Sequence, residues 1–327
     1  MKRVQTDDLD SISHYKMVDV TAPLPCRGEI LLRIAACGIG YVDALEALGR
    51  YQVKPSLPHV PGQEVSGRIE AIGPDVSDFQ VGDRVVTQIH GGFTELAIAP
   101  ATSVTRIPSS LDYSTAAGLK VNFVTALHAL VDRCQLKSGE TLLILGAAGG
   151  VGSAAVQVGK CLGAKVIAVA SSPEKQSYAL QLGADHAIGS EVETFRARVK
   201  ELCGQSGPNV VFDPIGGALF EPAFRSLSWG GRHLVVGFAG GSIPSLRANL
   251  PLLKGSSLVG VDVRQFEIFE PARAHQHLRD LLQWAEQGRL TPQIGKSFDF
   301  ADYAPALEYA LSGKGLGKTV LKIADLS

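Results

Sequence analysis

Several features that mark whole classes of protein are missing from this sequence. Its formal charge is only −1, so it lacks the excess of Lys and Arg that a nucleic-acid-binding surface needs. Its start, MKRVQTDDLD, lacks the apolar core of a signal peptide. Its longest weakly polar stretch, TLLILGAAGGVGSAAVQVG, has the glycines of a buried strand, turn and helix rather than the unbroken apolar run of a membrane span. We therefore expect a cytoplasmic protein that binds neither nucleic acid nor membrane.

Cysteine and histidine are too scattered to predict a metal site. The five cysteines are Cys26, Cys37, Cys134, Cys161 and Cys203. None stands in a CxxC pair, which argues against a disulfide framework or a structural zinc and favours a reducing compartment, so we interpret all five as small core residues. His59, His90 and His128 lie far apart in the sequence, and we expect His275 and His277 to face solvent. No GxSxG elbow supports a serine hydrolase.

The order of strand and helix patterns predicts an α/β fold with two domains. The first third has short strands separated by Pro and Gly, which indicates an antiparallel, partly open barrel. From about Tyr113, strands and helices alternate with short glycine-bearing links, as in βαβ units with a parallel sheet. After Val263 the regularity breaks, and we expect the last strands, IGKSFDF and KTVLKI, to return to the first domain. The prediction is a Rossmann-type, doubly wound domain (116–263) inserted into a discontinuous barrel domain (1–115 and 264–327).

The run LLILGAAGGVGSAAVQVG predicts a dinucleotide site. A buried strand leads into a glycine turn, and a helix begins at about Val151. Glycines there allow a tight turn, close approach of the backbone to a pyrophosphate and close helix–sheet packing, with the phosphates at the positive end of the helix dipole. The alternative is a purely structural turn in a cofactor-free domain. The predicted cofactor-binding residues of this loop are Gly149, Gly150, Val151 and Gly152.

The end of the next strand, KVIAVASS, bears on the choice of dinucleotide. NAD sites usually place Asp or Glu about 20 residues beyond the glycines, to bind the ribose 2′-hydroxyl. Here no acid follows, and the hydroxyls of Ser171 and Ser172 with the cation of Lys175 suit a 2′-phosphate. The same residues also fit a helix N-cap followed by Pro173, with Lys175 facing water. The two interpretations do not exclude each other, since an N-capped helix start itself attracts anions, and we predict NADPH.

At this point the chain resembles the medium-chain dehydrogenase/reductase superfamily, and within it the zinc-independent NADPH:quinone oxidoreductases. The motifs that carry the resemblance are GRYQVKPSLPHVPGQEVSGRIEAIG, VGDRV, GGFTELAIAP, LGADHAI, VFDPIGG and GKTVL. The resemblance implies a GroES-like fold for the barrel domain. Zinc members have Cys where Gly40 stands and His where Gln63 stands, and only the carboxylates Asp43 and Glu64 remain. Glycine and glutamine offer zinc neither thiolate nor imidazole, so we predict no metal.

The resemblance also implies substrate-binding residues. Tyr51 matches a tyrosine that lines the substrate pocket of the related reductases, where its phenol donates a hydrogen bond to a carbonyl or quinone oxygen. Tyr41 follows the former ligand position and is a second candidate donor. Gly40 departs from the branch, which usually has Asn there, and this change leaves the substrate open. For both tyrosines a structural role is the alternative.

Further positions implied by the resemblance lie around the cofactor. Thr125 matches a residue near the nicotinamide, and Asn122 lies one helical turn earlier on the same side. Phe238 and Ala239 follow a parallel strand at its carboxyl end, where open α/β sheets bind ligands. Core packing is the alternative for all four. Ser190 departs from the family, which often has Tyr near the adenosine, and this weakens the NADPH prediction.

The predicted function follows from a nicotinamide that faces a metal-free pocket. Quinones and α,β-unsaturated carbonyls accept hydride without a Lewis acid, because conjugation delocalises the incoming charge. One alternative is an enoyl- or acryloyl-thioester reductase, with Arg264 and Lys254 as donors to a CoA diphosphate. Another is a cofactor-binding protein with little turnover. We expect a homodimer joined along SSLVGV.

Overall fold

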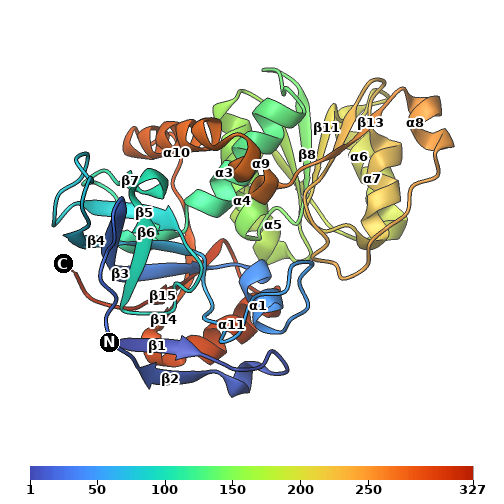
Figure 1. Cartoon of the computed structure of the whole chain (residues 1–327). Helices are drawn as coiled ribbons and strands as arrows, with labels where there is room; N and C mark the ends of the chain where they lie inside the picture. The colour runs from blue at the N-terminus through green and yellow to red at the C-terminus, as the bar shows by residue number, and fades with distance from the viewer. Residues whose placement is uncertain (327) are drawn as a thin grey trace. The chain divides into compact units, whose positions relative to one another are not determined.

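The structure, a computed structural model, describes residues 1–326 and contains two compact units (Figure 1). The first unit comprises Met1–Val121, Leu278–Gly288 and the chain from Pro292 onward. The second comprises Asn122–His277 and Arg289–Thr291. The sequence places the main boundaries after residues 115 and 263. In the structure they fall after 121 and 277, because the helices that follow residue 262 pack on the second unit through Phe266 and His277.

The first unit is built on a seven-stranded sheet in the order β14-β15-β3-β4-β5-β7, with β6 pairing the other part of β3. The bounds are β3 Glu29–Ile39, β4 Glu64–Ile72, β5 Arg84–Gln88, β6 Leu96–Pro100, β7 Thr105–Arg106, β14 Ile294–Asp299 and β15 Lys318–Lys322. The pairings are antiparallel except that of β14 with β15. Because β15 pairs with β3, the final strands do return to the first domain, as predicted. A separate pair, β1 (Lys2–Gln5) and β2 (Lys16–Asp19), is also antiparallel.

Short helices close the core of the first unit. They are α1 (Tyr41–Ala47), α2 (Tyr113–Ala117) and α11 (Tyr303–Leu311), with the 3₁₀ turns Ile12–His14, Ala101–Ser103 and Phe300–Asp302. Ala44 and Ala47 of α1 and Leu307 of α11 are fully buried in one cluster with Ile34 and Leu321 of the sheet. The small residues let the two helices lie close together over the strands. This packing fixes the start of α1, which matters for the site described below.

The second unit is a six-stranded parallel sheet in the order β10-β9-β8-β11-β12-β13. The strands are β8 Thr141–Leu145, β9 Lys165–Val169, β10 His186–Ile188, β11 Val210–Asp213, β12 Arg232–Val235 and β13 Ser257–Gly260. The central strands read as apolar runs because helices cover both faces, and Leu142–Leu145 are all fully buried. In chain order the sheet reads 3-2-1-4-5-6, which confirms the Rossmann-type prediction and puts a switch point between β8 and β11.

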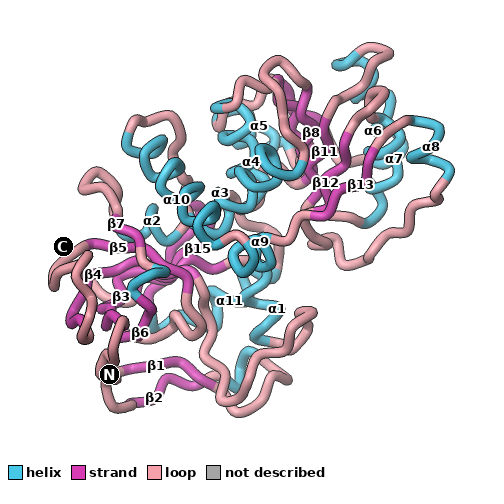
Figure 2. The backbone as a smooth tube through the Cα atoms, turned by 45° about the horizontal axis from the view of Figure 1, so that its top comes forward, coloured by secondary structure: helices cyan, strands magenta, loops and turns pink. Residues whose placement is uncertain are grey.

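Several helices of the second unit flank this sheet (Figure 2). The helices of this unit are α4 Gly150–Cys161, α5 Pro173–Gln181, α6 Val192–Cys203, α7 Phe220–Ser226, α8 Asn249–Lys254 and α9 Val263–Phe269, with a 3₁₀ turn at Gly217–Leu219. Two helices contain a boundary between the units: α3 (Lys120–Leu127), which continues into a π-helical turn at His128–Arg133, and α10 (Pro271–Glu286). Phe195 and Phe224 pack under the sheet. Across residues 1–326, no helix combines the length and apolar character needed to cross a bilayer.

The cysteines only partly match the sequence interpretation. Cys37 and Cys134 are buried, and burial raises the pKa of both thiols, so these two are core residues as expected. Cys26 is exposed, and Cys161 and Cys203 are half-buried, so the interpretation was wrong for Cys26. Cys26 lies in a turn, where its N–H donates to the Glu29 carboxylate at 2.8 Å, and not on a strand.

Candidate functional site

The glycine turn of the second unit connects β8 to α4. Gly146 follows the strand with a φ of +60°, a conformation that favours glycine. Gly149 is the N-cap and α4 begins at Gly150, one residue before the predicted start. A Cβ on Gly152 would fall on the carbonyl oxygen of Gly146, so only glycine fits there. The turn therefore leaves N–H groups at a helix start at the carboxyl edge of the sheet, beside the switch point.

Asn122 lies against this turn. A Cβ placed on Gly150 would lie 2.7 Å from the Asn122 side-chain nitrogen, so the amide occupies the space that a side chain at 150 would fill. Asn122 and Thr125 are buried on α3. The structure thus brings Asn122 together with the glycine loop, while Val151 is half-buried on the first turn of α4.

The loop after β9 starts α5. Ser172 is the N-cap, and its hydroxyl accepts the N–H of Lys175 at 3.3 Å. Ser171 is exposed and Lys175 is half-buried. The N-cap interpretation is therefore confirmed.

The loops after β11 and β12 are fixed by a residue that the sequence interpretation missed. Asp213 is buried at the end of β11, and its Oδ1 accepts the N–H groups of Ile215 and Gly216 at 2.8 Å each. Its Oδ2 lies 3.0 Å from Nε2 of the fully buried His233 on β12. Phe238 is half-buried and Ala239 is exposed beyond β12, where the Ala239 N–H donates to the Pro214 carbonyl at 3.1 Å. The DP dipeptide after a buried strand is the signal that could have revealed this turn.

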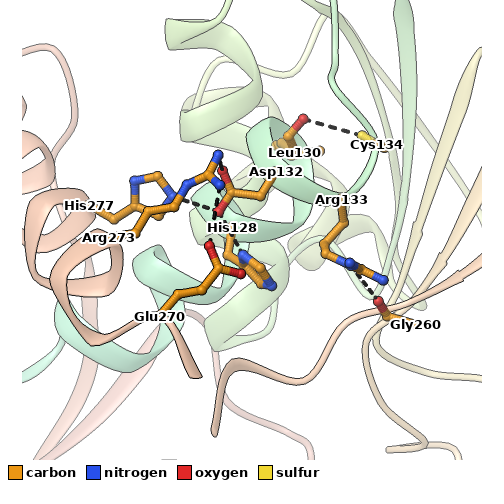
Figure 3. A network of polar contacts seen from close by, with 9 residues as sticks. All are labelled: His128, Leu130, Asp132, Arg133, Cys134, Gly260, Glu270, Arg273 and His277. Atoms are coloured by element: carbon orange, nitrogen blue, oxygen red, sulfur yellow. Dashed lines mark hydrogen bonds and ion pairs between the residues drawn. The ribbon is translucent and has the colours of Figure 1, made fainter. Parts of the chain in front are cut away.

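A second missed feature is the polar network around Asp132 (Figure 3). One oxygen of this buried carboxylate lies 2.7 Å from Nδ1 of His128 and 2.8 Å from Nε2 of His277. The other lies 2.5 Å from the Arg273 guanidinium. The His128 ring stacks on Phe266, with centroids 3.8 Å apart. The network ties the end of the helical segment that begins with α3 to α9 and α10.

The network corrects the prediction for His277 and sets the environment of His128. His277 is buried and bonded, so the expectation that it faces solvent was wrong; the pattern of α10 showed its apolar stripe but not a carboxylate partner on another helix. Burial lowers the pKa of His128, although Asp132 opposes this effect. Because a carboxylate oxygen only accepts, Nδ1 is the ring nitrogen of His128 that donates to Asp132.

In the first unit, Gly40 and Asp43 form the start of α1. The Gly40 N–H donates to Oδ2 of Asp43 at 2.7 Å, so the Asp43 side chain fixes the start of this helix. The other carboxylate oxygen of Asp43, Oδ1, is buried and has no hydrogen-bond partner among residues 1–326. Burial raises the pKa of Asp43 despite the nearby Lys318 cation. A Cβ added to Gly40 would meet only Asp43 within 4 Å, so glycine leaves open space beside this carboxyl.

Glu64 is held by a cation that the sequence did not predict. Its Oε2 lies 2.7 Å from Nζ of Lys318, with both side chains almost fully buried, and its Oε1 accepts the Val121 N–H at 3.0 Å. Burial alone would lower the pKa of Lys318, but the carboxylates of Glu64 and Asp43 outweigh it and raise that pKa. Lys318 belongs to the GKTVL tail, and only the pairing of β15 with β3 shows its position.

These residues do not fit a zinc ion. The Gln63 side chain donates to Glu46 at 2.6 Å and accepts from Gln88 at 3.2 Å, and Glu64 already binds an ammonium. Neither a thiolate nor an imidazole stands at the ligand positions. Among the residues that the structure describes, no group of three or more His, Cys, Asp or Glu side chains could hold a metal ion.

The two candidate tyrosines both belong to the first unit. Tyr41 is the first residue of α1, directly after Gly40, and is half-buried. Tyr51 lies in the bend that follows α1 and is also half-buried. Half-burial suits a phenol that packs its ring and presents its hydroxyl.

Comparison with known proteins places both units. A family model described as "Alcohol dehydrogenase GroES-like domain" matches residues 26–109, and one described as "Zinc-binding dehydrogenase" matches residues 150–282. The chain is 36% identical over 315 residues to quinone oxidoreductase-like protein 2 of Bos taurus, covering 94% of this chain and 89% of that protein. It belongs to the medium-chain dehydrogenase/reductase superfamily. It is also 33% identical over 308 residues to the quinone oxidoreductase of Homo sapiens, covering 93% and 92% of the two chains.

Solved structures agree with this membership. A mycobacterial protein, Rv1454c, complexed with NADPH superposes with a TM-score of 0.91 at 28% identity, covering 99% of this chain and 100% of that one. The CurK enoyl reductase superposes with a TM-score of 0.90 at 26% identity, covering 99% of each chain. The fold is therefore the GroES-like and Rossmann-like pair of this superfamily, and the chain is an oxidoreductase of its quinone oxidoreductase branch.

Proposed function

We propose that the protein is an NADPH-dependent, zinc-independent reductase of quinones or related α,β-unsaturated carbonyls. The observation that carries the proposal is the glycine turn with Asn122 packed on Gly150, beside a sheet edge suited to a dinucleotide. The NADPH-bound mycobacterial structure and the quinone oxidoreductase relatives support it. The donor set around Gly40 and Gln63 supports chemistry without zinc, since it offers no soft ligand.

In this proposal the second unit binds and orients the cofactor. The N–H groups at the start of α4 receive the pyrophosphate, while Asn122 and Thr125 of α3 and the loop at Phe238 and Ala239 meet the nicotinamide end. Bound NADPH supplies a hydride. The Asp132 network keeps α3 in place, so the side chains that orient the cofactor are rigid before it binds.

The first unit handles the substrate oxygen. The hydroxyl of Tyr51, and less directly that of Tyr41, donates a hydrogen bond to the carbonyl or quinone oxygen, where negative charge develops as hydride adds to the conjugated system. The open space beside Gly40 admits a ring that a side chain there would exclude. A proton from solvent or from a phenol then completes the reduction.

The test is NADPH oxidation by the purified chain with simple quinones, 2-alkenals and enoyl-CoA as separate acceptors. We expect Tyr51→Phe to lower kcat/KM about tenfold or more and to leave the Kd of NADPH unchanged, because it removes one donor to the developing oxyanion. Stoichiometric zinc whose removal abolishes activity would refute the zinc-independent scheme. Tight NADPH binding without turnover of any acceptor would favour a cofactor-binding protein instead.

A thioester substrate is the second candidate, favoured by the likeness to the CurK enoyl reductase. Its predicted cationic contacts are Arg264, which lies 3.2 Å from Asp262, and Lys254 at the end of α8, whose pKa is lowered by burial and by Arg196. If a CoA diphosphate binds there, Arg264→Ala should raise KM for enoyl-CoA and not for a simple quinone. Equal effects on both acceptors would exclude a CoA-specific contact.

We also propose that the chain forms a homodimer through the edge strand β13. This strand pairs with β12 on one side only, and Leu258 on it is 45% exposed. Nearby apolar side chains are more exposed still: Trp229 is 80% exposed, Leu252 79% and Leu253 68%. An open edge beside apolar side chains is a pairing surface. Sedimentation should give a dimer that Leu258→Lys dissociates; a monomer in the unmodified protein would refute it.

A further inference from the structure

A hollow of about 580 Å³ lies in the second unit, and no residue of the glycine turn lines it. Its lining residues are Gln176, Gly189, Glu191, Thr194, Ala197 and Arg198. Gln176 belongs to α5, Gly189 and Glu191 to the loop after β10, and the other three to α6. The hollow therefore opens where two neighbouring parallel strands, β9 and β10, end.

Hydrogen bonds join this hollow to the end of β9. The Gln176 side-chain nitrogen donates to the Ala170 carbonyl at 3.3 Å. The Ala170 N–H donates to the Ile188 carbonyl at 3.1 Å, and Gly189 follows Ile188 directly. The segment proposed for the 2′ end of the dinucleotide begins at the next residue, Ser171. The hollow and that segment thus share one edge of the sheet.

Arg198 is the cation of the hollow. Thr194, Ala197 and Arg198 are spaced i, i+3, i+4 and share one face of α6, while Phe195 and Val199 on another face are buried in the core. Arg198 pairs with Glu201 at 3.2 Å, but the two side chains are 62% and 65% exposed. Such an exposed pair contributes little, so the guanidinium can turn to a ligand without a large loss of stability.

We infer that this hollow receives the adenosine 2′-phosphate of NADPH and that Arg198 is the residue that selects NADPH over NADH. The inference rests on the proposed function and deepens it. A guanidinium binds phosphate oxygens in a bidentate fashion and is the usual partner of a 2′-phosphate in this kind of domain.

Glu191 acts in the opposite direction. Its carboxylate lies over Gly189, in the position that a Cβ at 189 would occupy, on the wall of the same hollow. A carboxylate repels a phosphate and accepts a hydrogen bond from a ribose 2′-hydroxyl. The hollow therefore holds Arg198, which favours NADPH, and Glu191, which favours NADH. The balance between these two side chains sets which cofactor binds more tightly.

The test measures binding of four probes to the full chain: NADPH, NADH, 2′,5′-ADP and 5′-AMP. Arg198→Ala should raise the Kd of NADPH and of 2′,5′-ADP about tenfold, which corresponds to about 1.4 kcal/mol, and change those of NADH and 5′-AMP less than about twofold. Glu191→Gln should lower the Kd of NADPH about threefold, because it removes a repelling charge.

The matched control is Arg196→Ala. Arg196 is exposed on the same helix but outside the hollow, and it acts on Lys254 of α8. The Arg196→Ala substitution removes one positive charge, as Arg198→Ala does, and should change the Kd of each of the four probes less than about twofold. Equal weakening by both variants would show a general charge effect and overturn the inference.

The outcomes separate this inference from the proposed function. If the unmodified chain oxidises NADPH but binds 2′,5′-ADP no more tightly than 5′-AMP, the assignment of the hollow is wrong and the reductase function stands. If the chain binds neither dinucleotide, the proposed function fails first. Unfolding midpoints of the variants should match the unmodified protein, since the three substituted side chains are exposed.

Discussion

Replacing Lys318 should destabilise the protein strongly and in a pH-dependent way. Lys318→Met keeps most of the side-chain volume but leaves Glu64 buried without its cation. Glu64 is 1% exposed and Lys318 5%, and their charged atoms are 2.7 Å apart. Removing one partner of such a pair costs about 3–5 kcal/mol of unfolding free energy. Asp43 adds a second buried carboxylate nearby, so the loss should lie in the upper part of that range.

The pH dependence follows from the buried carboxyl of Asp43, which also loses the nearby cation. Burial raises the pKa of Asp43 and Lys318 opposes this rise, so in Lys318→Met the folded-state pKa of Asp43 should lie further above its unfolded value. The folded state then favours the neutral carboxyl. Its contribution to the unfolding free energy is present at low pH and is lost as pH rises through the folded-state pKa. Urea unfolding at about pH 5 and about pH 8 should therefore show a larger deficit, relative to the unmodified protein, at the higher pH.

A double variant isolates the pair. Glu64→Gln removes the charge but keeps an oxygen that can accept the Val121 N–H. Combined with Lys318→Met it removes both charges of the pair, so the double variant should be more stable than Lys318→Met alone. A cost below about 1 kcal/mol for Lys318→Met, or strictly additive effects, would refute the argument that the pair is coupled.

Three further predictions concern the second unit. Gly152→Ala should lower the unfolding free energy by about 1–3 kcal/mol, since its Cβ would meet the Gly146 carbonyl, whereas Gly149→Ala, with its nearest atom at 3.5 Å, should be tolerated. Asp132→Asn should cost about 2 kcal/mol in urea unfolding, because it removes the charge shared by two imidazoles and a guanidinium. It should also weaken NADPH binding more than it lowers kcat; an unchanged Kd would contradict the role of the network in holding α3.

The fold was predictable because its strongest signals are local. The apolar runs of β8 and β9, with a glycine turn and a helix between them, predict a βαβ unit from a short stretch of sequence. The return of β14 and β15 to the first unit followed from their strand patterns. Boundaries were less predictable, because they depend on which unit a late helix packs against, and α9 is held by the stacking of Phe266 on His128.

The candidate site was predictable only where one segment carries it. The glycine turn and the Ser172 cap are read from neighbouring residues. Lys318 and Glu64, by contrast, are 254 residues apart in sequence, and Asp132 and His277 are 145 apart. Nothing in either segment alone indicates its partner. The Arg198 hollow is similar, because three segments line it and no single one resembles a binding motif.

The start of α1 shows how this chain balances charge at the former ligand position. Two buried carboxylates, Asp43 and Glu64, need compensation, because an isolated buried charge is costly. Lys318 compensates the charge of Glu64 through the 2.7 Å contact between Nζ and Oε2. Burial raises the pKa of Asp43, which favours the neutral form of that carboxyl. A divalent ion placed there would meet an ammonium group and find neither thiolate nor imidazole. The residues that remain therefore form a closed arrangement of their own, which supports the proposal that a hydrogen-bond donor such as Tyr51 stabilises the substrate oxygen.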